Sequence, residues 1–254
     1  MAKSSGSPRR TNFQHAALAQ YSFSTEKPPE DSISWKLWLA CQEIAQEALA
    51  SKYIQGIKNG NLDPNSYGQY SIQDAAYCHN AQKDYQTIED RAKADGFPEL
   101  AAFAQARYES YQSYTEGVVE AWHLASAGAV NPGQAAQTYI DFEHHAANDL
   151  PSIYGVIAMI PCDELWPWLA TELKPNVSSG NLYSFWIKEN DDWHGAYRLD
   201  NFIDSWFAAH PDVYNWDTAL YVMQSCMTCE ANFFRSACGQ KLLPMPTKPS
   251  SAAS

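Results

Sequence analysis

Basic residues are scarce in this sequence. Its 254 residues include 17 Lys and Arg against 29 Asp and Glu, which gives a formal net charge of −12. A surface of that sign repels a phosphate backbone, so we expect no nucleic-acid partner. Long apolar runs are missing too, because none approaches the roughly 18 residues that a membrane span needs. The first ten residues also lack the apolar stretch of a secretory signal. We therefore expect a cytoplasmic protein with no membrane partner.

Patterns typical of sheets and of repeat proteins are also missing. Alternating runs of β-branched residues are nearly absent, and no segment recurs at a fixed period, which argues against strands and against a solenoid. Apolar and aromatic residues instead recur at three- and four-residue spacing, which predicts helices. The predicted fold is an all-α, single-domain bundle over residues 31–240. Residues 1–30 and 241–254 are Ser- and Pro-containing and are predicted to be a flexible N-terminal arm and a flexible C-terminal tail.

Cap and turn residues set the expected helix limits. Asp63-Pro64 offers an N-cap followed by proline at the first helical position, and Gly239 is placed to close the last helix. A helix that begins at Pro151 must bend or break around Pro161 and Pro167. The other helices are predicted at about 32–57, 63–94, 98–126, 133–148, 179–207 and 212–238.

Three local patterns carry chemistry. Cys162 lies between two prolines, and it is either a buried apolar cysteine or a nucleophile, although its neighbours Asp163 and Glu164 supply no positive charge. Asp74 falls in the middle of a predicted helix, where aspartate is a poor helix former. Glu230 sits among apolar residues, so it is either a buried acid or an acid at a solvated helix edge.

Two further patterns suggest metal ions, and both have simpler explanations. Cys226 and Cys229 lack a second ligand pair, so packing is the favoured interpretation. Asp141 and His144 have the i, i+3 spacing of a di-metal carboxylate bundle, but no second copy of the motif exists. Surface charge is therefore the favoured interpretation there, and we expect no metal site and no cofactor. The 9 Trp and 15 Tyr fill a core or wall a pocket for a flat ligand.

A family resemblance joins these patterns. Residues 53–62, YIQGIKNGNL, and 70–77, YSIQDAAY, resemble the opening of the TenA family, also called thiaminase II. Ile160-Pro161-Cys162 and residues 230–237, EANFFRSA, continue the resemblance in order, so that it covers about residues 32–240. The family is a heme-oxygenase-like helical bundle that binds no heme. It hydrolyses aminopyrimidines released from thiamin and, in some members, thiamin itself.

The resemblance implies roles for particular residues. Cys162 is similar to the family's nucleophile and Glu230 to its catalytic acid, while Asp74 matches the aspartate that holds the aminopyrimidine. Tyr77 and Tyr139 match pocket tyrosines. The resemblance also implies a homo-oligomer, either a tetramer or a dimer.

This sequence departs from the family at two pocket positions. Trp166 stands where the family usually carries a tyrosine, and Asn190 replaces the tyrosine that follows a Trp-Ile pair. A tryptophan can stack and donate a hydrogen bond but cannot accept one as a phenol does. The expected function is therefore aminopyrimidine hydrolysis with Cys162 as nucleophile, acting on an aminopyrimidine or thiamin-like ligand. A non-catalytic pyrimidine-binding protein of the same fold is the alternative, and a di-metal oxidase built on Asp141 and His144 is a third.

Overall fold

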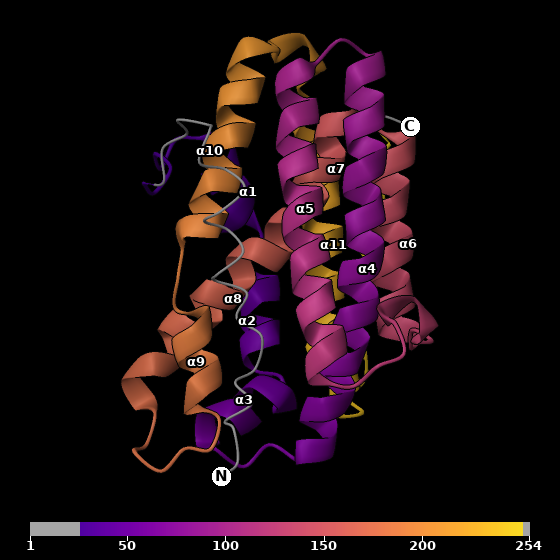
Figure 1. Cartoon of the computed structure of the whole chain (residues 1–254). Helices are drawn as coiled ribbons and strands as arrows, with labels where there is room; N and C mark the ends of the chain where they lie inside the picture. The colour runs from indigo at the N-terminus through magenta and orange to yellow at the C-terminus, as the bar shows by residue number, and fades with distance from the viewer. Residues whose placement is uncertain (1–25, 251–254) are drawn as a thin grey trace.

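The computed structural model describes residues 26–250 (Figure 1). Within that range the chain is helical and contains no strand. The helices, in chain order, are α1 (Ile33–Ala40), α2 (Gln42–Leu49), α3 (Lys52–Asn59), α4 (Pro64–Ala94), α5 (Pro98–Ala121), α6 (Gln134–Asp149), α7 (Ser152–Ala158), α8 (Ile160–Leu173), α9 (Ser184–Asn190), α10 (His194–Ala209) and α11 (Trp216–Ala237). The predicted all-α fold class is confirmed.

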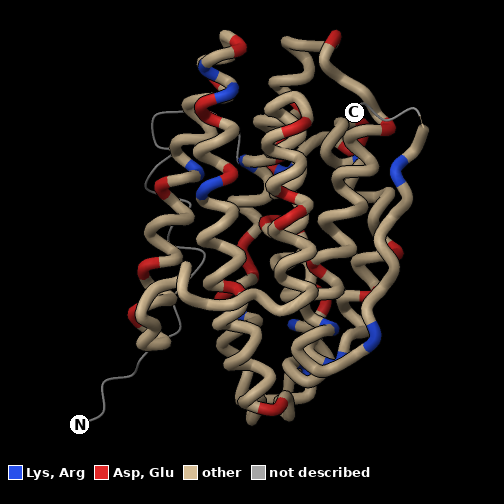
Figure 2. Tube along the Cα trace, turned by 90° about the vertical axis from the view of Figure 1, so that its right-hand side faces the viewer, with Lys and Arg blue, Asp and Glu red and all other residues tan. Residues whose placement is uncertain are grey.

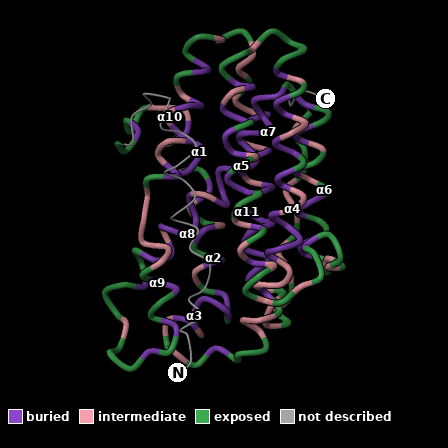
Figure 3. The backbone as a smooth tube through the Cα atoms, viewed as in Figure 1, coloured by how far each residue is buried: buried purple, intermediate pink, exposed green. Residues whose placement is uncertain are grey.

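The bundle is organised around α11. The long helices α4 and α5 run side by side, and α6 packs along α4 (Figure 1). Most of α11 is buried, and it contacts α2, α3, α4, α6, α7 and α8. Buried positions accordingly concentrate along the inward faces of these helices (Figure 3). Side chains from several helices can therefore meet at α11.

Local sequence explains the helix ends. The Asp63 side chain accepts a hydrogen bond from the backbone N–H of Asn65, and Pro64 occupies the first position of α4, as predicted. The Asn215 side chain caps α11 by accepting from the N–H of Thr218. Gly60 ends α3 in the left-handed conformation, with φ of 70°.

Two long helices predicted from the sequence are interrupted. The predicted helix 32–57 is three short helices, because Cys41 leaves the helical conformation and Ser51 becomes the extended N-cap of α3. The predicted helix 179–207 is α9 and α10, separated at residues 191–193, where the Asp192 side chain accepts from the N–H of His194. A hydroxyl cap at Ser51 and a carboxylate cap at Asp192 thus separate helices that apolar spacing alone had joined, whereas the break at Cys41 has no side-chain cap.

The prolines in the segment after Pro151 have unequal effects. The chain breaks at Met159, which separates α7 from α8. Pro161 then lies in the first turn of α8, where a missing N–H leaves no hydrogen bond unmade. Pro167 lies inside α8 without ending it. The predicted bend or break around Pro161 is confirmed as a break, whereas α8 does not break at Pro167.

The terminal segments differ in how much can be described. Residues 1–25 of the predicted arm lie outside the described residues. The predicted C-terminal tail begins with fixed residues: Asn232 of α11 accepts from the N–H of Leu243 at 2.6 Å and donates to its carbonyl oxygen at 3.0 Å. Leu242, Leu243 and Met245 also pack against the core. This first part of the tail is therefore anchored to the bundle.

The surface of the described residues is acidic, and Asp and Glu positions are scattered along the helices (Figure 2). Within residues 26–250, no helix combines the length and the apolar character required to cross a bilayer.

Candidate active site

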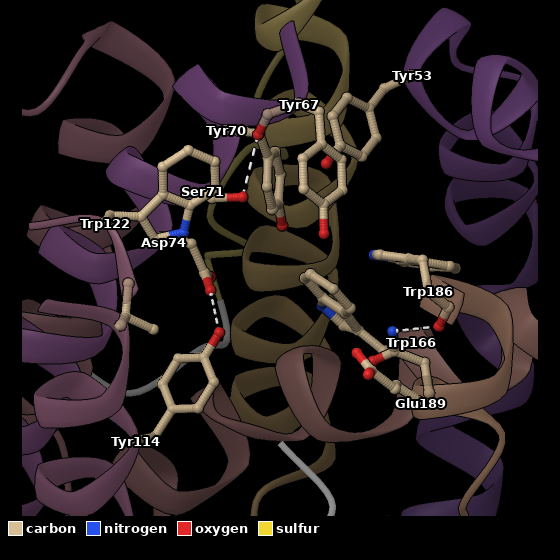
Figure 4. Close-up of a pocket in the computed structure, with 12 residues that line it drawn as sticks. Tyr53, Tyr67, Tyr70, Ser71, Asp74, Tyr114, Trp122, Trp166, Trp186 and Glu189 are labelled. Atoms are coloured by element: carbon tan, nitrogen blue, oxygen red, sulfur yellow. Dashed lines mark hydrogen bonds between the residues drawn. The ribbon is translucent and has the colours of Figure 1, made fainter. Parts of the chain in front are cut away.

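A cavity opens between α4, α5, α8 and α9 (Figure 4). Its volume is about 50 Å³, or about 520 Å³ when the space in its open mouth is included. Aromatic rings form most of the wall, and two carboxylates are present. The lining residues are Tyr53, Tyr67, Tyr70, Ser71, Asp74, Tyr114, Val118, Trp122, Trp166, Trp186, Glu189 and Asn190. A wall of this kind suits a flat ligand that carries hydrogen-bond donors at one edge.

Asp74 brings a carboxylate to this cavity from the middle of α4. It is buried, and the hydroxyl of Tyr114 on α5 donates to its Oδ2 at 2.7 Å (Figure 4). This position explains why an aspartate stands in a helix interior, because its carboxylate lines the cavity and accepts a hydrogen bond from another helix. Of the two carboxylates that line the cavity, Asp74 and Glu189, only Asp74 was predicted from the sequence.

Trp166 and Asn190 also line the cavity, as predicted. The indole of Trp166 lies 5.4 Å from the Trp186 ring and 5.8 Å from the Tyr70 ring, measured between centroids. The Asn190 amide donates to the carbonyl oxygen of Trp186 at 2.8 Å, so this hydrogen bond stays within α9. A tyrosine at position 190 would instead have brought a phenol, which can both donate and accept hydrogen bonds, to the cavity wall.

Cys162 lies one helical turn before Trp166 and is buried. It is in the first turn of α8, where the exposed N–H groups of a helix favour a negative charge. The hydroxyl of Tyr111 donates to its Sγ at 3.7 Å. Burial, and next the nearby Cys162, raises the pKa of Tyr77 and of Tyr111. Both phenols therefore stay protonated and can donate.

Two other predicted residues, Tyr77 and Tyr139, are near enough to Cys162 for it to raise their pKa, and Tyr139 connects them to a third, Glu230. The rings of Tyr77 and Tyr139 stack at 4.6 Å, and the hydroxyl of Tyr139 donates to Glu230 Oε1 at 3.3 Å. Burial, followed by Glu230, Glu143 and Cys162, raises the pKa of Tyr139. The interpretation of Glu230 as a buried acid is confirmed, since the residue is almost fully covered. We call Cys162, Tyr77, Tyr139, Glu230, Tyr111 and Glu143 the buried polar cluster.

Glu143 was not predicted to belong to this cluster. It is fully buried, and the hydroxyl of Tyr77 donates to its Oε1 at 2.8 Å. Burial, and next Asp84, raises its pKa well above the usual range, and hydrogen bonds from Tyr77 and Tyr139 oppose the rise. The sequence did contain a sign of its position, because Glu143 follows Tyr139 by four residues and shares its helix face.

Arg107 supplies the positive charge that the sequence around Cys162 lacks. Its guanidinium pairs with the Asp163 carboxylate, and the two side chains are only 4% and 9% exposed. The same guanidinium lies 5.4 Å from the ring of Tyr111, the donor to Cys162. Arg107 and Asp163 are 56 residues apart in the chain, so no local pattern could have revealed the pair.

The predicted site residues thus fall into two adjoining sets. Asp74, Trp166 and Asn190 line the cavity, whereas the cluster residues are not among its lining. Tyr70, Trp166, Phe233 and Phe234 form an aromatic layer that connects the sets. Tyr70 contacts the other three rings, and Phe233 in turn contacts Tyr77.

The predicted metal-type patterns make other contacts. Asp141 accepts from Gln137 at 2.7 Å, whereas the His144 imidazole is 2.8 Å from Asp84. Among residues 26–250, no group of three His, Cys, Asp or Glu side chains could hold a metal ion. The di-metal alternative therefore has no ligand set in this part of the chain. Cys226 and Cys229 are buried free thiols, in line with the packing interpretation.

Comparison of the sequence with known proteins finds one relative. No protein-family model matches the chain. The thiamine biosynthesis multifunctional protein ThiED of Corynebacterium efficiens is 24% identical over 156 residues, which is 59% of this chain and 20% of that protein. The chain therefore matches about a fifth of the length of this relative.

Three solved structures resemble the bundle over most of its length. A TenA homologue from P. horikoshii OT3 has a TM-score of 0.66 and 20% identity, covering 81% of this chain and 98% of its own. A TenA family transcription regulator from Silicibacter sp. TM1040 has a TM-score of 0.67 and 14% identity, and the match covers 83% of this chain and 98% of the regulator. A TenA homologue from Pyrococcus furiosus has a TM-score of 0.62 and 15% identity, and the match covers 81% of this chain and 99% of the homologue. The resemblance to TenA is confirmed at the level of the fold.

Proposed function

Because the chain has the fold of TenA homologues, we propose that it is an aminopyrimidine hydrolase of the thiaminase II type, with Cys162 as the nucleophile. One observation carries the proposal: a cysteine in the first turn of a buried helix accepts a hydrogen bond from one phenol, while a second phenol of the same buried polar cluster donates to a buried acid, beside an aromatic cavity that holds a carboxylate. The name of the ThiED relative places that protein in thiamine biosynthesis, which supports a thiamin-related role for this one.

Binding uses the cavity. The pyrimidine ring stacks against the aromatic wall, and Asp74 accepts hydrogen bonds from its amidine-like edge. Tyr114 already holds one oxygen of Asp74 and fixes the direction of the carboxylate. The surrounding rings exclude water and so strengthen this polar contact.

The chemistry uses Cys162 and Glu230. The thiolate attacks the electron-poor ring and forms a C–S bond, and the C–N bond to the amine breaks as Glu230 hands the amine a proton. A water molecule then gives a proton back to Glu230 and adds at the carbon that the amine left. Cleavage of the C–S bond restores the thiolate. The net change replaces the amine with a hydroxyl and releases ammonia.

Substrate entry requires movement of the aromatic layer. A volume of about 50 Å³ holds little more than water, and Cys162 does not line it. Tyr70 and Trp166 line the cavity and belong to the aromatic layer, so rotation of these two rings is the proposed opening towards the buried polar cluster. Turnover is therefore expected to depend on the size of residue 166.

The direct test is ammonia release from 4-amino-5-aminomethyl-2-methylpyrimidine. Native protein is expected to turn over and Cys162→Ala to lose turnover. Cys41→Ala is the matched control, since Cys41 is equally buried but lies at the start of α2. Turnover that survives in Cys162→Ala would remove the nucleophile assignment.

A non-catalytic binding protein is the second candidate, and Trp166 and Asn190 favour it. Trp166 cannot accept a hydrogen bond, and the Asn190 amide is engaged within its own helix. Calorimetric binding of the same pyrimidine without ammonia release would establish this candidate. The double variant Trp166→Tyr with Asn190→Tyr is then expected to gain turnover.

A further inference from the structure

The proposed mechanism uses one of the two carboxylates in the cavity wall and leaves the other, Glu189, without a role. Glu189 is half-buried and belongs to α9, whereas Asp74 belongs to α4. Figure 4 shows the Glu189 side chain beside Trp166, and the Asp74 side chain on the other side of the cavity beside Tyr114. The two negative groups therefore reach the same cavity from different walls.

No cation in the wall balances these charges. Among the described residues, those that line the cavity include two carboxylates and no Lys, Arg or His. Lys188 and Lys174 line a separate hollow, where Lys174 pairs with Asp191. The rest of the cavity wall is mostly aromatic, and the face of an aromatic ring attracts a cation. Both the charge and the rings of the cavity therefore favour a positively charged ligand over a neutral one.

The wall also offers a hydrogen bond that no protein group uses. Tyr53 lines the cavity and is fully buried, and its hydroxyl has no hydrogen-bond partner among the described residues. Burial, followed by Tyr67 and Asp74, raises the pKa of Tyr53, so the phenol keeps its proton and can donate. An unpaired buried hydroxyl costs stability until another molecule pairs with it. This hydroxyl therefore indicates a ligand with a polar atom, independently of the two charges.

We propose that Glu189 is a specificity-determining residue, which together with Asp74 makes the cavity select pyrimidines with a positively charged side arm over neutral pyrimidines of the same shape. Asp74 accepts from the edge of the ring, and Glu189 accepts a charge-assisted hydrogen bond from the ammonium of the arm. The choice of a pyrimidine rests on the proposed function, whereas the preference for a cation does not.

This contact precedes the chemical step. It forms while the ring lies in the cavity, and the arm meets Glu230 only after the aromatic layer has opened. Because burial disfavours an ammonium, the arm gives its extra proton to water at the open mouth of the cavity before it moves on. It then reaches Glu230 as the neutral amine that this acid protonates. Glu189 thus acts on substrate capture and not on bond cleavage.

Calorimetric binding of two matched probes tests the preference. 4-Amino-5-aminomethyl-2-methylpyrimidine carries an ammonium at neutral pH, and 4-amino-5-hydroxymethyl-2-methylpyrimidine is its neutral counterpart of the same size. In Cys162→Ala, which keeps turnover from obscuring the measurement, the ammonium probe is expected to bind at least about tenfold more tightly. Adding Glu189→Gln is expected to weaken the ammonium probe at least about fivefold and to change the neutral probe less than about twofold.

Two variants separate charge from shape. Asp191→Asn is the matched control, because it removes a carboxylate of the same chain segment that does not line the cavity, and it is expected to leave the preference unchanged. Glu189→Asp keeps the charge and is expected to retain more of the preference than Glu189→Gln. Added salt is expected to weaken the ammonium probe less once Glu189→Gln is present. An unchanged preference in Glu189→Gln, or an equal loss of both probes, would overturn the proposal.

Turnover separates this inference from the proposed function. Without the Cys162 substitution, Glu189→Gln is expected to raise KM for the aminomethyl compound at least about fivefold with little change in kcat, and an unchanged KM would overturn the role in capture. If neither pyrimidine binds or turns over, the proposed function fails, and benzylammonium and benzyl alcohol then decide the cation preference. Benzylammonium is expected to bind the native protein and to lose at least about fivefold in Glu189→Gln. No binding, or equal binding of the two benzyl compounds, would overturn the preference.

Discussion

The buried ion pair beside Cys162 gives the sharpest prediction about stability. Arg107→Met keeps much of the apolar stem of Arg107 but removes the guanidinium, and it leaves the Asp163 carboxylate buried without its cation. Both side chains are more than nine-tenths covered, so water cannot take the place of the lost charge. Removing one member of such a pair costs about 3–5 kcal/mol. We expect a loss of that size in the free energy of unfolding.

A second variant separates the charge from the packing. Arg107→Met combined with Asp163→Asn leaves no buried charge, so the double variant is expected to be about 2 kcal/mol more stable than Arg107→Met alone. Urea unfolding followed by helical circular dichroism and by tryptophan fluorescence measures both values. A cost below about 1 kcal/mol for Arg107→Met, or a double variant no more stable than the single one, would refute the reasoning.

Arg107→Met is also expected to change the reactivity of Cys162, because Tyr111 contacts both residues. The guanidinium lies 5.4 Å from the Tyr111 ring, and the Tyr111 hydroxyl donates to Cys162 Sγ. Loss of Arg107 is therefore expected to slow alkylation of Cys162 by iodoacetamide, measured by mass spectrometry of that site, with Cys238 in the same sample as the internal reference. Equal Cys162 rates in native protein and in Arg107→Met would separate the ion pair from the nucleophile.

Three further predictions follow from single contacts. Tyr114→Phe removes the hydroxyl that donates to Asp74 at 2.7 Å, so it is expected to lower the free energy of unfolding by about 1.5 kcal/mol, and an unchanged urea midpoint would contradict this contact. Gly155→Ala is expected to cost about 1–3 kcal/mol, because its Cβ would lie 2.8 Å from one core side chain and 3.1 Å from the backbone of α6. Gly180→Ala is the control, since its Cβ would meet no atom within 4 Å, and equal stability of the two variants would contradict the packing. Burial raises the pKa of Asp84 from 3.8 to about 6, so the folded state binds the Asp84 proton more tightly than the unfolded state does, and stability falls as pH rises through this window. Relative to Asp84→Asn, the native protein is expected to lose up to about 3 kcal/mol between pH 4 and pH 7 in urea titrations, and parallel pH curves would contradict the shift.

The fold was predictable to the extent that it depends on short-range spacing. Apolar positions three and four apart identified the α4 and α11 segments, and Asp63 marked the start of α4 and Gly239 the end of α11. The long helices predicted at 32–57 and 179–207 were wrong partly because the Ser51 hydroxyl and the Asp192 carboxylate compete for backbone N–H groups; the break at Cys41 has no such side-chain cap. Apolar spacing does not record that competition.

The candidate site divides along a similar line. Asp74, Cys162 and Glu230 stand in segments whose order along the chain resembles that of a known family, so they could be named before any geometry was known. Arg107 could not, because its partner Asp163 is reached only when α5 packs beside α8. An isolated arginine on a helix is usually solvated, and nothing in the sequence around it indicates burial.

Glu143 marks the boundary between the two cases. Its helix face was readable, since Tyr139, Glu143 and Ala147 follow one another at four-residue spacing and all are buried. What the spacing could not give is the identity of the facing groups, which come from α4 and α11. An acid on an apolar helix face is costly unless other helices supply donors, and here Tyr77 supplies one. A buried acid on such a face is therefore a reason to look for a phenol on the neighbouring helix, as Tyr77 of α4 is for Glu143.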